Sequence, residues 1–232
     1  MTNLFENIRS KIKAGTRISD EEALALFNSD DLLAIGELAA LSNHYANGDK
    51  VYFNVNRHIN YTNICVNRCT FCAFSRADEG DDGGYTLALN DILKRAAEAS
   101  AAGATEIHMV GGLHPELPFD FYLEILASIK ADNPTLHIKA FTAVEIDYFA
   151  ELTGQSPTDV ILELKNAGLG SMPGGGAEIF APQVRKQICP EKITGARWLE
   201  VTEQVHQAGL KSNATMLFGH VETYADRVDH LA

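Results

Sequence analysis

Three of the four cysteines of the 232-residue chain lie within eight residues, in the segment NICVNRCTFCAFSR. Cys65, Cys69 and Cys72 form a Cys-x3-Cys-x2-Cys pattern, while the fourth cysteine lies more than a hundred residues further on. Thiolates are soft ligands that select zinc, copper(I) or iron–sulfur clusters. A structural zinc site needs four ligands, and the nearest histidine precedes the loop on a predicted strand. The pattern favours a four-iron cluster with one open iron over zinc or buried free thiols.

Composition narrows the class of protein. The formal net charge is −12, with 46% hydrophobic and 22% charged residues, which is typical of a globular domain. The negative charge repels a phosphate backbone and no Lys/Arg block offsets it, so we expect no nucleic-acid partner. No run approaches the roughly 18 apolar residues of a membrane helix, and no signal peptide begins the chain. We expect a cytoplasmic protein whose reducing surroundings keep the cysteines available as ligands.

Hydrophobic periodicity predicts the elements that position these cysteines. Apolar residues at helical spacing, with Ser19 as a start signal, predict helices over the first fifty residues. From residue 51 onward strands alternate with helices, and three helical stretches end in Ala-Gly, the residue pair typical of a helix-to-strand turn. The predicted strands are Tyr52–Asn63, Glu106–Val110, Leu136–Thr142, Leu169–Met172 and Leu210–Phe218.

Strand–helix alternation predicts parallel strands, because a parallel crossover needs a connection of helix length. Polar or glycine-rich segments follow several strands, which favours a TIM-like (β/α) barrel over an open sheet, since barrel sites are built at that end. Five strands are too few to close a barrel. We therefore expect a helical segment over residues 1–50 and a barrel core over residues 51–232 that is incomplete at its C-terminal side.

The cysteine segment resembles the signature of the radical S-adenosylmethionine (SAM) superfamily. The resemblance implies a barrel of the radical SAM type and a [4Fe-4S] cluster whose open iron binds the amino and carboxylate groups of SAM. Reduction then breaks the sulfonium C–S bond and yields a 5′-deoxyadenosyl radical. It also implies that Phe71 lies beside the adenine, although simple core packing is the alternative for this residue.

The same resemblance suggests further SAM contacts. Gly111 and Gly112 stand where the superfamily contacts the amino group of SAM, but Leu113 replaces the usual acid, and a tight turn explains a glycine pair equally well. Glu178 follows three glycines, where related barrels bind the ribose or amino group with a carboxylate. Arg197 is the candidate partner for the methionine carboxylate. Arg185 is its alternative, and for both arginines a solvated helix surface is the competing interpretation.

Candidate substrate contacts follow the second, third and fourth predicted strands. They are His114, Glu145 and Arg185, each of which has a structural alternative. A capping or surface histidine is common, and Glu145 is also typical of the first turn of a helix, where the dipole favours a carboxylate. Lys192 is a further cation that could pair with substrate carboxylates.

Five segments, among them HIKAFTAVEI and SNATMLFGH, are similar to aminofutalosine synthase of the futalosine route to menaquinone. This resemblance implies addition of the adenosyl radical to 3-[(1-carboxyvinyl)oxy]benzoate, with flavodoxin or ferredoxin as a reductant. The sibling enzyme that cyclises dehypoxanthine futalosine, and a non-catalytic truncated metal-binding domain, are the alternatives. Cluster assembly and product analysis separate the three.

Overall fold

The computed structural model describes residues 2–232 of the chain. Contacts divide the chain into two compact units, one formed by Met1–Phe53 with Phe218–Ala232 and the other by Asn54–Leu217. The first unit is helical, as the periodicity predicted, and contains α1 (Thr2–Lys13), α2 (Asp20–Phe27), α3 (Leu32–Asn47) and α10 (Tyr224–Leu231). Helix α1 packs on α3, and α10 packs on α2. Ser19 begins α2 with a capping box that it shares with Glu22, which confirms the predicted start signal.

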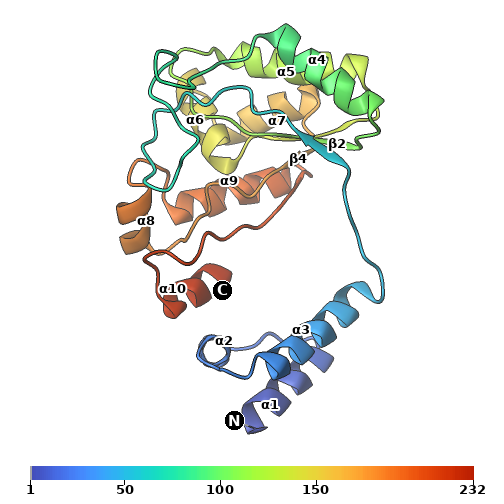
Figure 1. Cartoon of the computed structure of the whole chain (residues 1–232), viewed down its shortest axis with the longest axis vertical. Helices are drawn as coiled ribbons and strands as arrows, with labels where there is room; N and C mark the ends of the chain where they lie inside the picture. Colours follow the sequence, from blue (N-terminus) through green and yellow to red (C-terminus); the bar gives the residue numbers. More distant parts are fainter. Residues whose placement is uncertain (1) are drawn as a thin grey trace. The chain divides into compact units, whose positions relative to one another are not determined.

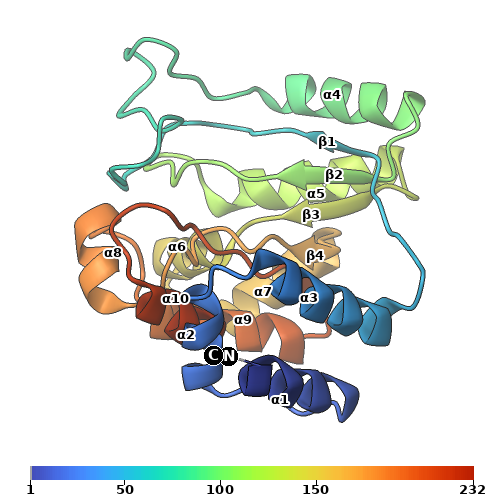
Figure 2. The same ribbon diagram turned by 60° about the horizontal axis from the view of Figure 1, so that its bottom comes forward.

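The second unit contains a parallel sheet of five strands in the order β1-β2-β3-β4-β5. The strands are β1 (Asn56–His58), β2 (Glu106–Met109), β3 (His137–Ala140), β4 (Ser171–Met172) and β5 (Lys211–Ser212). All five predicted strands are present, and each is shorter than predicted. Figure 1 shows the chain order, and Figure 2 shows β1, β2 and β3 side by side. Strand order equal to chain order is the topology of part of a (β/α) barrel.

Helices connect each strand to the next. They are α4 (Leu89–Ala101), α5 (Phe119–Asp132), α6 (Ala143–Thr153), α7 (Pro157–Ala167), α8 (Pro182–Ile188) and α9 (Gly195–Gln207). Gly103, Gly168 and Gly209 close α4, α7 and α9 with positive φ angles of 84°, 122° and 79°, which confirms the predicted helix-to-strand turns. None of the helices within residues 2–232 is both long and apolar enough to cross a membrane.

The two faces of the sheet differ sharply. Alternate strand residues such as Ile107, Met109 and Ile138 are fully buried in the main hydrophobic core, together with residues of α4, α5, α7 and α9. The opposite face is polar, and in a closed barrel it would be the interior. The imidazoles of His58 and His108 stack there with ring centroids 4.5 Å apart, and burial lowers the pKa of His108.

Candidate cluster and cofactor site

One cavity brings together the ends of four strands. The cysteine loop follows β1, Gly111 and Gly112 follow β2, Thr142 and Glu145 follow β3, and Gly176 follows β4. Because parallel strands present their carboxyl ends at the same edge of a sheet, segments far apart in the sequence meet here. Cys65, Cys69 and Cys72 all line this cavity, and each is half-buried with a free thiol.

Backbone hydrogen bonds hold the cysteine loop at both of its sides. The N–H of Cys65 donates to the carbonyl of Arg76 at 3.0 Å, and the N–H of Val66 donates to that of Leu113 at 3.0 Å. In the middle of the loop, the N–H of Thr70 donates to the carbonyl of Ile188 at 2.8 Å. The loop is therefore fastened to the end of β2 and to α8 rather than left to solvent.

The donor set fits a cluster better than a single metal ion. Within residues 2–232 no three His, Cys, Asp or Glu side chains converge on a point that could hold one ion, as tetrahedral zinc requires. Three thiols spread over the wall of one cavity suit a four-iron cluster, in which each thiolate binds a different iron. Burial raises the pKa of Cys69 to about 11, so ligation must displace its proton.

The glycine pair is required by packing. A Cβ on Gly112 would lie 2.0 Å from the carbonyl oxygen of Ile64, and one on Gly111 would lie 2.4 Å from the ring of Tyr61. The N–H of Gly112 also donates to Thr62 at 3.0 Å. These glycines let the end of β2 lie directly against the start of the cysteine loop, and both also line the cavity. A role in packing and a contact with a cofactor are therefore compatible here.

Glu145 is a buried carboxylate with four donors. The hydroxyl of Tyr61 donates to Oε1 at 2.6 Å and the N–H of Gly111 donates to the same oxygen at 3.1 Å. The N–H and hydroxyl of Thr142 donate to Oε2 at 2.7 and 2.8 Å. Burial raises the pKa of Glu145, and the four donors oppose that increase. The carboxylate joins the segments that follow β1 and β2 to the start of α6, where it completes a capping box.

Glu178 and Lys192 form an ion pair of 2.5 Å between Oε1 and Nζ. The ammonium of Lys192 also lies 5.2 Å from the ring centroid of Phe71, whose own side chain is 41% exposed. Burial alone would lower the pKa of Lys192, but Glu178 and Cys69 outweigh it and raise that pKa. Phe71, the residue expected beside the adenine, and Glu178, the expected carboxylate contact of SAM, therefore both lie beside the ammonium of Lys192.

The other candidate cations do not line the cavity. The guanidinium of Arg185 donates to the carbonyls of four residues. Three of them, Gly176, Ala177 and Ile179, lie in the loop before α8, and Ile193 lies after that helix. Arg197 pairs with Asp147 and Glu200. The ring of His114 is buried, and its Nδ1 accepts the N–H of Glu116 at 3.1 Å.

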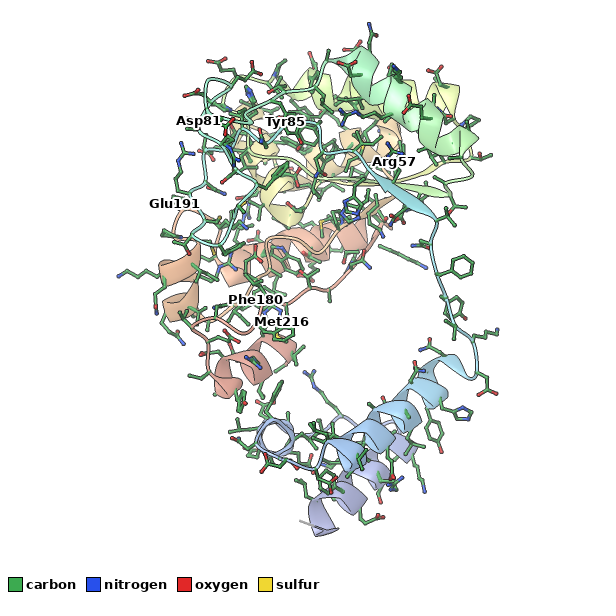
Figure 3. The ribbon with its side chains drawn as sticks, in the orientation of Figure 1. Arg57, Asp81, Tyr85, Phe180, Glu191 and Met216 are labelled. Carbon is green, nitrogen blue, oxygen red and sulfur yellow. The ribbon has the colours of Figure 1, made fainter. Side chains whose placement is uncertain are left out.

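Sequence reasoning missed the surroundings of Cys189. This residue is buried in a small apolar cluster with Ile179 and Val184, and Cys69 packs against that cluster. Met216, labelled in Figure 3, also contacts it. The separation of Cys69 and Cys189 in sequence gave no sign that they lie so close. The sequence held one signal of this cluster: Ile and Val recur around α8 at helical spacing, which indicates a buried apolar face.

Comparison with known proteins agrees with this geometry. The family model described as the Radical SAM superfamily matches residues 59–232, and the chain belongs to this superfamily. A 5-amino-6-(D-ribitylamino)uracil–L-tyrosine 4-hydroxyphenyl transferase of Methanopyrus kandleri is 46% identical over 184 residues, which cover 79% of this chain and 50% of that protein. The aminodeoxyfutalosine synthase of Streptomyces coelicolor is 41% identical over 228 residues, covering 98% of this chain and 59% of that protein.

Among solved structures, HydG, a maturase of the [FeFe]-hydrogenase, matches with a TM-score of 0.77 and 17% identity, covering all of this chain and 50% of that one. This likeness confirms the predicted fold, a partial barrel of the radical SAM type. The chain thus spans about half to three-fifths of the length of these relatives. Membership of the superfamily implies a [4Fe-4S] cluster and SAM, and the three clustered cysteines have the matching spacing.

Proposed function

We propose that this chain carries the site of an aminodeoxyfutalosine synthase. The reaction joins the 5′-deoxyadenosyl group of SAM to the enolpyruvyl double bond of 3-[(1-carboxyvinyl)oxy]benzoate. After rearrangement and loss of the carboxylate, the products are 6-amino-6-deoxyfutalosine and methionine. The observation that carries the proposal is the segment HIKAFTAVEI, which resembles that class and which places Thr142 and Glu145 in the wall of the cavity.

The chain's own residues supply ligation, position and shielding. When bound, the cluster and SAM supply the adenosyl radical. Cys65, Cys69 and Cys72 hold the cluster at the cavity wall, and we assign Gly111, Gly112, Glu178 and Phe71 to the SAM side of the cavity. The mainly apolar lining of Val110, Leu113 and Val144 keeps water from the reacting atoms. Radical and alkene must be held within near-attack distance, which a site on strand ends can achieve.

A second function has a specific observation in its favour. The tyrosine 4-hydroxyphenyl transferase of Methanopyrus kandleri is 46% identical to this chain, and a protein of the same name in Microcystis aeruginosa is 42% identical over 97% of it. Identity therefore does not rank the synthase above this transferase. The second candidate is transfer of the 4-hydroxyphenyl group of L-tyrosine to 5-amino-6-(D-ribitylamino)uracil.

Parallel assays of one anaerobically reconstituted preparation separate the candidates. Each assay contains SAM and dithionite, and receives either the enolpyruvyl benzoate or L-tyrosine with the ribitylaminouracil. Mass spectrometry of the first should show 6-amino-6-deoxyfutalosine with one methionine released per product. A 4-hydroxyphenyl adduct in the second assay alone would replace the proposal with the transferase. Flavodoxin or ferredoxin then replaces dithionite, to test the proposed protein reductant.

Two further outcomes identify the remaining alternatives. Conversion of dehypoxanthine futalosine with release of free 5′-deoxyadenosine would indicate the sibling cyclase, because the synthase incorporates that group instead. An intact cluster that cleaves no SAM in any assay would indicate a metal-binding domain without activity. The variant Cys69→Ala is the blank for every assay, because it lacks a cluster ligand under the proposal.

A further inference from the structure

Lys192 is the one basic side chain among the described residues that line the cysteine cavity. The nearby arginines do not line it: Arg185 is held by loop carbonyls and Arg197 by two carboxylates. Arg68 and Arg76, in the cysteine loop, donate to backbone carbonyls of that loop. Half-buried thiolates repel one another, and three thiolates with a bound 2+ cluster core still carry a net negative charge, so a nearby positive charge stabilises a site of this kind. Lys192 is placed to supply it.

Two contacts and burial of the side chain fix the position of the ammonium group. Glu178 pairs with it at 2.5 Å, the ring of Phe71 lies 5.2 Å away, and the side chain of Lys192 is only 15% exposed. Glu178 itself has a φ of 48°, in the left-handed region that non-glycine residues rarely occupy. Its carbonyl accepts the N–H of Leu217 at 2.9 Å, which holds this strained backbone. Strain of this kind persists where the surrounding structure determines the position of a side chain.

The ammonium acts on the cysteine loop directly. Phe71, over which it lies, is the residue between Thr70 and Cys72. Lys192 also lines the same cavity as Cys69. The other half of the ion pair, Glu178, has no such contact with Phe71. The pair therefore presents its positive end to the loop that carries the cluster ligands.

We propose that Lys192 tunes the cluster, by stabilising the extra negative charge that the cluster gains on reduction. This inference rests on the proposed cluster. A [4Fe-4S] core of charge 2+ with three thiolates carries one negative charge, and one electron from a low-potential donor such as dithionite makes it two. An adjacent ammonium favours the more negative state and raises the reduction potential. Lys192 therefore acts on the ease of electron uptake and not on substrate recognition.

The test is a dithionite titration of the reconstituted chain, followed by electron paramagnetic resonance of the reduced cluster. Lys192→Met should disfavour reduction about tenfold or more, a shift of about 59 mV to lower potential for one electron. Lys192→Arg keeps the charge, so its reduction potential should stay close to that of the unmodified chain. Glu178→Gln removes the opposing charge and should shift the potential in the other direction. Lys186→Met, at an exposed lysine of α8, is the matched control and should leave the potential unchanged.

Opposite shifts for Lys192→Met and Glu178→Gln support electrostatic tuning, since general disruption of the site would not give opposite signs. An unchanged potential in Lys192→Met with a full cluster overturns the inference. Weaker SAM binding at an unchanged potential would also overturn it, and would make Lys192 a ligand of SAM. If Lys192→Met assembles no cluster, the Glu178→Gln variant is the deciding test. A higher reduction potential in that variant supports the inference, and an unchanged or lower one overturns it. Absence of a cluster in the unmodified chain would instead overturn the proposed function.

Discussion

Glu145 shows how one side chain organises the base of the site. Its two oxygens accept hydrogen bonds from Tyr61, Gly111 and Thr142, which belong to three successive strand–loop segments. A carboxylate can accept all four, because it has about four lone-pair positions and no proton of its own to place. Hydrogen bonds to a charged group contribute about 1.5–3 kcal/mol each in favourable cases. The position of Gly111 therefore depends in part on this residue.

Glu145→Gln should destabilise the second unit by about 2–4 kcal/mol, because an amide nitrogen would face donors that cannot reverse. The N–H groups of Gly111 and Thr142 are such donors, whereas the hydroxyl of Tyr61 can rotate. Urea unfolding measures the change. The control is Tyr61→Phe, which removes one donor and leaves the carboxylate in place, so it should lower the free energy of unfolding by less. An equal decrease in the free energy of unfolding in both variants would contradict this role of the carboxylate.

Cys69→Ala should abolish cluster assembly and leave the chain folded, because the loop is held by its backbone and not by its thiols. Cys189→Ala should retain the cluster, since Cys189 packs in the apolar cluster beside α8 and does not line the cysteine cavity. Iron and sulfide analysis with the visible absorbance of the reconstituted proteins checks both. Iron lost from the Cys189 variant would mean that the ligand set is wrongly assigned.

Side-chain types and spacing were enough to predict the superfamily and its cofactors, but not the partners of the charged residues. Glu145 was a candidate substrate contact with the first turn of a helix as the alternative, and the structure does place it in the first turn of α6, in a capping box. Its hydrogen bond to Tyr61 joins residues 84 positions apart, which no local pattern encodes. The carbonyls that accept from Arg185 depend in the same way on the shape of the loops on either side of α8. Local features such as ligand spacing can be predicted from the sequence. Hydrogen bonds between residues far apart in the chain depend on the fold.

At the scale of elements, the close approach of β2 to the cysteine loop is the decisive packing feature. Gly112→Ala should push the loop away, because the added Cβ would lie 2.0 Å from the carbonyl oxygen of Ile64. Backbone atoms cannot move aside as the end of a flexible side chain can. We therefore expect the variant to be less stable by about 3 kcal/mol or more and to assemble the cluster poorly. Thermal unfolding and iron content measure these effects.

Gly36→Ala is the matched control for Gly112→Ala. Gly36 lies inside α3, and a Cβ built there has no neighbour within 4 Å. Alanine favours a helix interior over glycine by about 1 kcal/mol, so this variant should be slightly more stable than the unmodified chain. A Gly112→Ala protein that unfolds at the same temperature as Gly36→Ala would show that the loop can move without cost.

The strands were predicted in the right order and at the right places, but too long. The first was predicted over residues 52–63, and β1 is limited to Asn56–His58. Ile59 and Tyr61 beyond it are still fully buried at alternate positions. Their burial comes from contacts with the core, while regular pairing with β2 has already ended. Hydrophobic alternation reports burial, and it extends beyond the hydrogen-bonded ladder.

At the scale of the whole molecule, the residues just before the boundary at Phe53 form an accessible stretch of apolar side chains. Val51, Tyr52 and Phe53 are 90%, 74% and 84% exposed, outside any helix or strand. Limited chymotrypsin digestion should therefore cut first after Tyr52 or Phe53. Phe218 is also exposed, but the N–H groups on either side of it are hydrogen-bonded. Mass spectrometry of the first fragments identifies the cut.

The double variant Tyr52→Ser, Phe53→Ser should resist that first cut and give the later fragments at unchanged rates. All four cysteines should be found in the C-terminal fragment, because the cysteine positions follow the cut. A first cut inside α5 or α6, where Tyr122 and Phe149 are buried, would contradict the division into units.

The hydrogen bond from Thr70 to Ile188 has a consequence for synthesis. It joins positions 118 residues apart, so a nascent chain that has just left the ribosome with its cysteines exposed still lacks the surface on which they dock. The thiols spend that interval on an unfastened loop, open to oxidation by any dissolved oxygen. We therefore expect yields of loadable protein to depend on how quickly translation reaches α8, with slow codons between the two segments reducing them.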